Sequence, residues 1–305
     1  MAREQLGVCS EANLHGSYLL LNVLEGHERF MRLKLAKLPQ LFERLAGHFS
    51  EAMLTGVVAV GSSFWDALYP NARPADLTSF PELNDDGIEL TPMPIDLFIQ
   101  VRSDRFDVNV ITCQQVMQLL HGHVEVQEHL QGFRYLDGRT LTGFIDAPFN
   151  PPVRVKRKAA LVDADQQPVF AAGSYLHVQI QRFDNYSWQQ LDCSEQQGIM
   201  GYDKVTGKPL AEDVILPDSH FVKMGGGQAP TVLMQNMPFY QINRQGLIQV
   251  GYAANASALS QQFNRRFSIN PEQGPSDALL PYLQFELSAA FFAPSISFLE
   301  LSTKV

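Results

Sequence analysis

The chain has 305 residues, of which 45% are hydrophobic and 18% charged, so it can bury one large core or two ordinary ones. Its net charge of −9 disfavours nucleic acid and anionic membrane surfaces as partners, because both carry the same sign as the protein. No stretch approaches about 18 uninterrupted apolar residues, the first residues lack a signal-like pattern, and three cysteines are widely spaced, which predicts a cytoplasmic protein without a membrane span.

The first half predicts elements in the order β, α, β, β, α, β. Apolar runs bounded by turn residues predict strands at Ser17–Leu24, Thr55–Gly61 and Ile95–Val101. Spacings of three and four predict a helix through Leu35, Leu38, Phe42, Leu45 and Phe49, and a second at Asp107–Leu120. An extended segment or hairpin is expected at Gly132–Gly143.

The second half repeats that order. We expect strands at Ser174–Gln181, Thr231–Met237 and Gly246–Ala254, and a short helix at Glu195–Met200. Asn255 can cap a helix whose apolar face is Ala256, Leu259, Phe263 and Phe267. A last helix at Ser276–Leu283 is expected to lead to a final segment at Ala289–Phe292.

Two βαββαβ units predict an α+β protein made of two ferredoxin-like subdomains, each with an antiparallel sheet and helices on one face. The subdomains are expected at residues 1–149 and 150–305, joined by a proline-containing and basic linker at Asn150–Lys158. This fold hosts many unrelated functions, so the function must be argued from particular residues.

Two segments hold candidate chemistry. Asp146 follows the apolar end of an expected strand in Thr142–Pro151, and His220 ends the loop sequence Pro217-Asp-Ser-His220. Taken alone, Asp146 could cap a turn and His220 could lie on the surface, so the residue types leave both readings open.

Together the two segments resemble the signature of dye-decolourising (DyP-type) haem peroxidases. Gly143-Phe-Ile-Asp146-Ala147 with Asn150-Pro151 is similar to the family's GFxDG…NP motif, and Asp218-Ser-His220 to its DSH motif. Further similarities occur in the family's order at 173–179, 200–204, 235–238 and 292–295. The resemblance therefore spans nearly the whole chain, and its two ferredoxin-like units agree with the predicted order of elements.

The resemblance implies a haem b-dependent peroxidase that reduces hydrogen peroxide while oxidising an organic reductant. His220 would be the axial ligand of the haem iron, with its other ring nitrogen held by a carboxylate, for which Asp277 is the candidate. Asp146 would move a proton between the oxygens of peroxide on the opposite face. The resemblance also implies a homo-oligomer.

The rest of the signature segment would lie beside the haem. Gly143, Phe144, Ile145 and Ala147 are therefore expected to contribute to haem binding. Ala147 replaces the family's glycine, so a methyl group would narrow the pocket or strain a turn that needs a positive φ.

Two other departures also fall near the expected site. Met234 stands where the family usually has a distal arginine, and Asn236 can still donate a hydrogen bond there. Tyr202 replaces an arginine expected to contact a haem propionate, a role for which Lys204 and Lys223 are substitutes.

These departures keep other readings open. The chain could bind haem without turnover, as a carrier, a sensor or a degenerate peroxidase, and His220 with Met234 could form a six-coordinate iron site. A haem-free relative with a filled pocket is a third reading, which the retained Asp146 and His220 disfavour. Whether Arg244 or another cation reaches the distal pocket is left open by the sequence.

Overall fold

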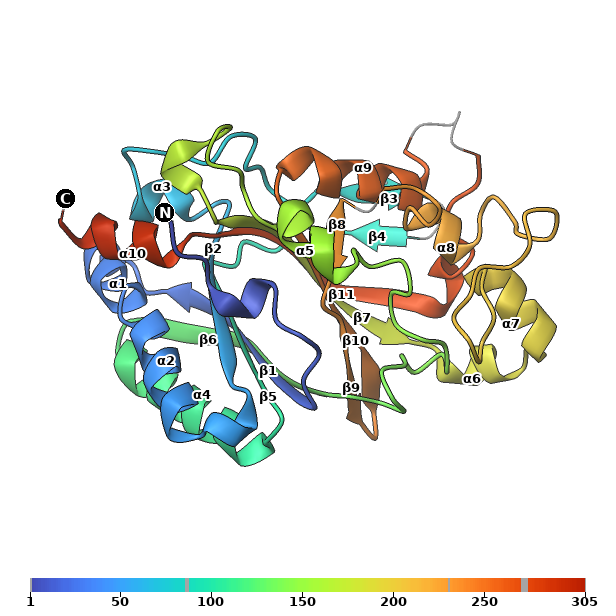
Figure 1. Ribbon diagram of the computed structural model, residues 1–305, viewed down its shortest axis with the longest axis horizontal. Coiled ribbons are helices and arrows are strands. Elements are labelled where there is room, and N and C mark those ends of the chain that lie inside the picture. The colour runs from blue at the N-terminus through green and yellow to red at the C-terminus, as the bar shows by residue number, and fades with distance from the viewer. Residues whose placement is uncertain (1, 86–87, 230, 270–273, 305) are drawn as a thin grey trace.

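The computed structural model describes residues 2–85, 88–229, 231–269 and 274–304 (Figure 1). In the N-terminal half the strands are β1 (His15–Val23), β2 (Thr55–Gly61), β3 (Leu83–Asp85), β4 (Ile88–Leu90), β5 (Leu97–Ser103) and β6 (Val124–Phe133). The helices are α1 (Glu28–Leu35), α2 (Leu38–His48), α3 (Trp65–Leu68) and α4 (Phe106–Leu120). Strands β3 and β4 pair with each other. They and the helices α1 and α3 were not predicted, whereas β1, α2, β2, β5, α4 and β6 follow the predicted order.

The C-terminal half begins with a helix and then repeats the pattern. Its strands are β7 (Ser174–Phe183), β8 (Val232–Met234), β9 (Met237–Gln241), β10 (Arg244–Ala253) and β11 (Leu283–Ala293). Its helices are α5 (Val153–Ala160), α6 (Asn185–Gln189), α7 (Cys193–Met200), α8 (His220–Lys223), α9 (Ala256–Phe267) and α10 (Ile296–Leu301). Asn255 caps α9 as expected, because its side chain accepts a hydrogen bond from Ala258 N.

The strands of both halves join in one antiparallel sheet, in the order β6-β1-β5-β2-β11-β7-β10-β8, with β9 also paired to β10. In the N-terminal half β6 lies beside β1, and β5 lies between β1 and β2. In the C-terminal half β11 lies beside β7, and β10 lies between β7 and β8. This order of strands is the ferredoxin-like arrangement. The halves meet where Val60 and Gly61 of β2 pair with Phe292 and Phe291 of β11. The predicted fold of two ferredoxin-like units is confirmed.

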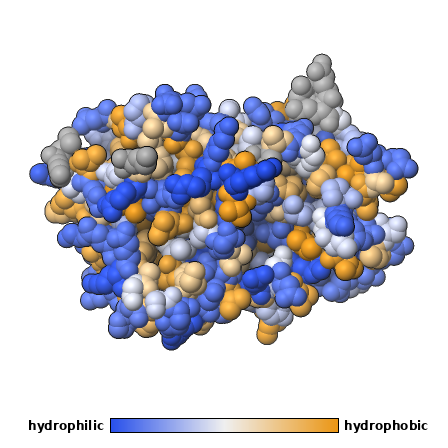
Figure 2. All heavy atoms as spheres, in the orientation of Figure 1, coloured by the Kyte–Doolittle hydropathy of each residue, from blue (hydrophilic) through white to orange (hydrophobic). Residues whose placement is uncertain are grey.

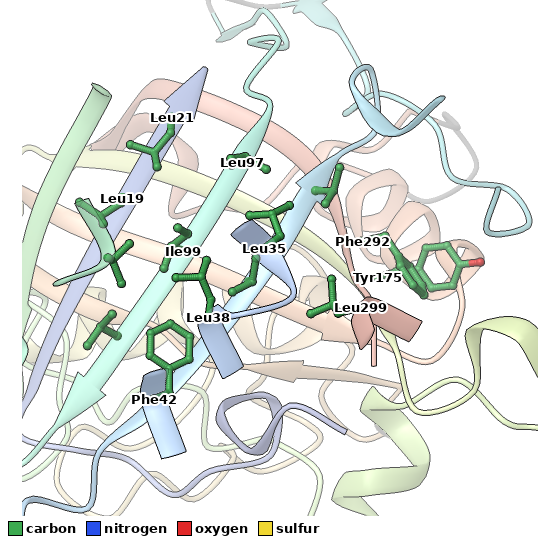
Figure 3. Packing of buried hydrophobic residues seen from close by; sticks show 14 of the residues in the cluster. Leu19, Leu21, Leu35, Leu38, Phe42, Leu97, Ile99, Tyr175, Phe292 and Leu299 are labelled. Carbon is green, nitrogen blue, oxygen red and sulfur yellow. The ribbon is translucent and has the colours of Figure 1, made fainter. Parts of the chain in front are cut away.

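The two faces of the N-terminal sheet bury different partners. Leu19 and Ile99 face helices α2 and α4 in a cluster of buried apolar side chains (Figure 3). The neighbouring residues Tyr18 and Phe98 point the other way, because side chains alternate along a strand, and they pack toward the strands of the other half. Phe98 lies 5.6 Å, between ring centroids, from Phe291 of β11. The cores of the two halves are therefore continuous.

The linker expected at Asn150–Lys158 is wrong, because most of it is helix α5. Pro152 stands at the N-cap, where a missing N–H costs no helical hydrogen bond, and Ala159 and Ala160 are buried. Arg154, Arg157 and Lys158 are exposed, whereas the side chain of Lys156 is largely buried. Figure 2 shows hydrophilic side chains over this helix near the middle of the visible face. We propose that the boundary between the subdomains lies between residues 149 and 150, just before α5.

The last predicted helix is also wrong, since Ser276–Leu283 contains only the short 3-10 helix Leu280–Tyr282. Pro281 cannot donate a backbone hydrogen bond, and Leu279 N bonds to the side chain of Asp277 instead of a helical carbonyl. The extended segment expected at Gly132–Gly143 starts earlier and is shorter, because β6 ends at Phe133 and a turn-rich loop follows.

Candidate functional site

His220 is fixed at the first residue of α8 by a buried carboxylate. Its Nδ1 lies 2.7 Å from Asp277 Oδ2, which accepts the hydrogen bond when Nδ1 carries the proton. The side chain of Asp277 is fully buried and that of His220 is 12% exposed. The described residues offer His220 Nε2 no hydrogen-bond partner. The ring is thus oriented by one nitrogen, and the other remains available to a ligand.

Asp277 is itself held as an anion by several donors. Arg266 Nε donates to Oδ2 at 3.2 Å, and Leu279 N donates to Oδ1 at 3.0 Å. Burial alone would raise the pKa of Asp277, but His220 and Arg266 outweigh it and lower the pKa below its usual value. Arg266 also donates to Gln249 Oε1 at 2.9 Å. A buried polar network therefore runs from β10 to His220.

Asp146 and Asn236 form a second polar pair. Asn236 Nδ2 donates to Asp146 Oδ1 at 2.8 Å, and Asn236 Oδ1 is buried without a partner among the described residues. Burial raises the pKa of Asp146 to about 6, although the bond from Asn236 and the charges of His220 and Arg102 act in the opposite direction. This carboxyl can therefore change its protonation state near neutral pH.

The loop that carries Asp146 is clamped to β8. Asn150 donates from Nδ2 to Met234 O at 2.8 Å and accepts at Oδ1 from Met234 N, also at 2.8 Å. Ala147 has a φ of +41°, the left-handed conformation that the sequence raised as a source of strain. The single strand expected at Thr231–Met237 is interrupted after Met234, and this break places Asn236 opposite Asp146.

A cavity, which we call the His220 cavity, brings these groups together. It holds about 580 Å³ of empty space, including its open mouth. Its lining comprises Thr140, Leu141, Thr142, Asp146, Ala147, Phe149, Gln181, Phe183, Met200, Tyr202, His220, Met224, Asn236, Gly246, Leu247, Gln249, Arg266, Leu279 and Leu283. A smaller cavity of about 350 Å³ beneath α9 shares the walls Met224, Gln249 and Arg266 with it. The helix-covered side of the C-terminal sheet is thus hollow.

Four of the residues expected at the site line the His220 cavity, namely Asp146, Ala147, His220 and Asn236. They come from three separate segments, so only the tertiary fold unites them. The partner expected for His220, Asp277, is confirmed by the hydrogen bond between the two side chains. Tyr202, which occupies an expected propionate position, lines the cavity but donates its hydroxyl to Ile145 O at 3.0 Å.

Other expected contacts lie away from the cavity wall. Phe144 is fully buried against Tyr202, with ring centroids 5.5 Å apart, so its side chain packs inside the protein and anchors the loop that carries Asp146. Gly143 turns the chain at a φ of +83°, and neither it nor Ile145 lines the cavity. Lys223 is buried and donates to Ser268 Oγ at 3.3 Å, also outside the lining. The structure does not bring these side chains to the cavity.

Met234 lies beside the smaller cavity and not in the wall of the His220 cavity. Its sulfur is 3.9 Å from Gln262 Nε2 of α9, and the side chain is buried. The structure therefore does not bring Met234 and His220 to opposite walls of one cavity. Arg244 is also elsewhere, because Nη2 pairs with Glu128 at 2.6 Å and Glu286 at 2.8 Å.

Three polar residues near the site were not predicted from the sequence, namely Gln249 and Arg266 behind His220 and Arg102 from the other half. Arg266 interrupts the apolar face of α9, three residues after Phe263, which is an unusual place for a guanidinium. Arg102 and Gln100 occupy alternate positions of the apolar strand β5, and both side chains bond to Gln235. A charged or amide group at a core position was the available signal.

Family comparisons match both halves. The family model described as Dyp-type peroxidase, N-terminal, matches residues 5–134, and Dyp-type peroxidase, C-terminal, matches residues 137–298. A dye-decolorizing peroxidase of Mycolicibacterium paratuberculosis is 28% identical over 289 residues, covering 93% of this chain and 81% of the relative. The sequence similarity thus extends over nearly the whole chain.

Solved structures agree with this result. A DyP-type peroxidase protein of Shewanella oneidensis superimposes with a TM-score of 0.94 at 32% identity, covering 99% of both chains. A DypB variant of Rhodococcus jostii RHA1, solved in complex with heme, has a TM-score of 0.88 at 25% identity, covering 95% of this chain and 96% of that one. The likeness includes both ferredoxin-like halves.

Proposed function

This chain belongs to the Dyp-type peroxidase family, and we propose that it is a haem b-dependent enzyme that reduces hydrogen peroxide and oxidises an organic reductant. The observation that carries this proposal is the placement of His220 in a cavity that also presents the Asp146–Asn236 pair. An oriented imidazole can ligate haem iron, and a carboxyl near its titration point can transfer the proton of peroxide.

The residues of the His220 cavity suit a haem group. His220 Nε2 has no hydrogen-bond partner among the described residues, and the Asp277 carboxylate accepts from Nδ1, which leaves a lone pair on Nε2 for a metal. Apolar side chains such as Leu247, Leu279 and Phe183 can pack against a flat, largely apolar ring. The Rhodococcus jostii relative, which was solved in complex with heme, supports the same cofactor here.

His220 would hold the iron, and Asp277 would keep the imidazole in one tautomer and increase its basicity. When bound, haem would supply the redox chemistry that couples the reduction of peroxide to the oxidation of the organic reductant. Because Arg266 keeps Asp277 ionised inside the protein, the strength of the ligand depends on this whole network.

Asp146 would act on peroxide as a base and then as an acid. In its ionised form it would take the proton from the near oxygen, and the protonated carboxyl would then deliver it to the far oxygen. The far oxygen would leave as water when the O–O bond breaks, with two electrons that come ultimately from the organic reductant. Asn236 Nδ2 holds the carboxyl in place, and its unpartnered Oδ1 can accept a hydrogen bond from peroxide or water. A pKa of about 6 suits both halves of this transfer.

A haem-binding protein with little or no turnover is the second candidate, and Met234 is the observation that favours it. The expected arginine would stabilise the anion formed during O–O cleavage, and loss of one such donor costs about 10²–10³ in rate. The thioether of Met234 cannot donate a hydrogen bond, and it lies outside the His220 cavity.

We further propose that the protein works in the cytoplasm as a homo-oligomer, with neither nucleic acid nor membrane as a partner. The three cysteines, Cys9, Cys113 and Cys193, are free, which fits a reducing compartment. Among the described residues, no helix has both the length and the apolar character needed to cross a bilayer. The net charge of −9 opposes binding to other polyanions.

The test is an absorption spectrum of the haem-reconstituted protein before and after a small excess of hydrogen peroxide. A high-spin ferric spectrum that changes with peroxide and returns when a reductant is added supports the peroxidase. Bound low-spin haem that does not respond to peroxide supports the second candidate. Failure to retain haem overturns both.

A further inference from the structure

A second cavity, which we call the inter-subdomain cleft, also borders Asp146 and Asn236. It holds about 990 Å³ including its open mouth, and its walls come from the segment 10–13, β5, the loop after β6, α5 and the β8–β9 segment. Because its lining residues come from both halves, the cleft lies where the two halves meet, and it is bordered by α5, whose position Figure 1 shows. Asp146 and Asn236 are the polar side chains that it shares with the His220 cavity.

The cleft carries positive charge on an otherwise acidic protein. Its walls contain four basic side chains and two carboxyls, namely Arg102, Arg134, Arg139, Lys156, Glu11 and Asp146. Lys156 pairs with Glu11 at 3.1 Å, whereas none of the three arginines pairs with a carboxylate of the described residues. Because the chain as a whole has a net charge of −9, this local excess of cations needs an explanation.

Arg102 is the most unusual of these cations because it is only 2% exposed. Nη1 donates to Gln235 Oε1 at 2.8 Å, Nε is buried without a partner, and Nη2 has no hydrogen bond to a described residue. A buried guanidinium that makes no direct ion pair is costly, and an unsatisfied buried donor of this kind commonly marks a missing water or ion. The guanidinium thus keeps its Nε–Nη2 edge for a group outside the protein.

We propose that the inter-subdomain cleft binds a small anion, a carboxylate or an inorganic oxyanion, through Arg102. The two parallel donors on one edge of a guanidinium match two oxygens of such a group. The anion would form the ion pair that Arg102 does not make with any described carboxylate, at a place where only the more distant charge of Asp146 acts on this guanidinium. This site goes beyond the proposed peroxidase function and would exist in the haem-free chain.

Neighbouring side chains prepare the cleft for such a ligand. Arg139 is held by the carbonyl oxygens of Gly143 at 2.8 Å and Val205 at 3.1 Å, so its charge is fixed before a ligand arrives. Arg134 is exposed and makes a single bond to a backbone carbonyl, which leaves donors for an anion at the mouth. The charge therefore extends from the buried Arg102 to solvent.

The test is calorimetric titration of the haem-free protein with inorganic phosphate and, separately, with acetate, using sodium chloride to match ionic strength. We expect saturable binding of one of these anions at one site per chain. Replacing the guanidinium in Arg102→Met should weaken it about tenfold or more, as expected for a charge-assisted hydrogen bond. Preference for phosphate would identify an oxyanion site, and preference for acetate a carboxylate site.

A charge reversal at the cleft mouth keeps the test valid if Arg102→Met does not fold. Arg134→Glu should weaken binding about tenfold by repulsion, whereas Arg154→Glu, the same change at an exposed position of α5 outside the cleft lining, should change it less than twofold. No saturable binding in the unmodified protein, or binding that is equal in the Arg134 and Arg154 variants, overturns the proposal.

Discussion

The two halves share one topology but differ in what their sheets present to their helices. In the N-terminal half, Leu19, Leu21 and Ile99 face the helices and are at most 3% exposed. In the C-terminal half, Gln181 and Gln249 face the His220 cavity, with a hydrogen bond of 2.8 Å between them. Buried amides stabilise a fold less than apolar side chains do, so this face is not built for packing alone. The proposed chemistry therefore lies on the face where polar side chains take the place of apolar ones.

The largest expected effect is the loss of haem retention in His220→Ala. The variant removes the only imidazole in the described lining of the His220 cavity and leaves Asp277 with Arg266 as its one charged partner among the described residues. Gel filtration followed by haem quantification measures the effect. The control His48→Ala changes an exposed histidine of α2 and should retain haem. Full haem content in the His220 variant would show that His220 is not the iron ligand.

Asp146→Asn should retain haem but slow the reaction with peroxide by about 10²–10⁴-fold, the usual contribution of a positioned acid–base group. Because the ionised form accepts the proton and burial raises the pKa of Asp146 to about 6, the wild-type rate should rise with pH through this value. Stopped-flow absorbance from pH 4.5 to 8 measures both. Asp137→Asn, in the same loop but exposed, is the control, and an unchanged rate profile in Asp146→Asn would exclude the proposed role.

Ile99→Ala tests the other half of the comparison. Ile99 is fully buried between β5 and the N-terminal helices, so the lost contacts should reduce the free energy of unfolding by about 2–5 kcal/mol. Urea denaturation measures this loss. The folded variant should bind haem with the affinity of the wild type. A loss of haem affinity as large as the loss of stability would show that haem binding in the C-terminal half depends on packing in the N-terminal core.

Asp277→Asn should weaken haem binding about 10–100-fold, because the amide cannot supply the charge that orients His220 and balances Arg266. Haem titration of the haem-free variant measures the affinity. The exposed Asp163→Asn serves as the control. Equal affinities in the two variants would mean that the hydrogen bond to His220 does not influence ligation.

The smallest expected effect is a gain in stability of up to about 1 kcal/mol in Ala147→Gly, because glycine adopts the φ of +41° without the penalty that alanine has there. Ala159→Gly in helix α5 is the matched control and should lose about 1 kcal/mol, as glycine does in a helix. Thermal unfolding should show a higher melting temperature than the wild type for Ala147→Gly and a lower one for Ala159→Gly. A loss of stability in both would show that strain at Ala147 is negligible.

Local patterns predicted most of the fold. The apolar runs of β1 and β5 and the spacing of apolar residues in α2 and α9 follow short-range rules, so the order βαββαβ could be predicted from the sequence in both halves. The predictions failed where hydrogen bonds to distant groups decide the backbone, as in the segment before β11, where Asp277 N bonds to Arg266 O. The helix α5 was missed because four of its eight residues are basic and it directly follows two prolines, a composition typical of a linker.

The sequence by itself determined the two ferredoxin-like units, the family, and His220 and Asp146 as the residues of interest, because these depend on local periodicity and on short motifs. Only the tertiary structure decided which side chains meet. Arg266 of α9 reaches Asp277 behind His220, and Arg102 reaches Gln235 from the other half. Such contacts follow from how strands and helices pack, and a single chain carries no local signal for them.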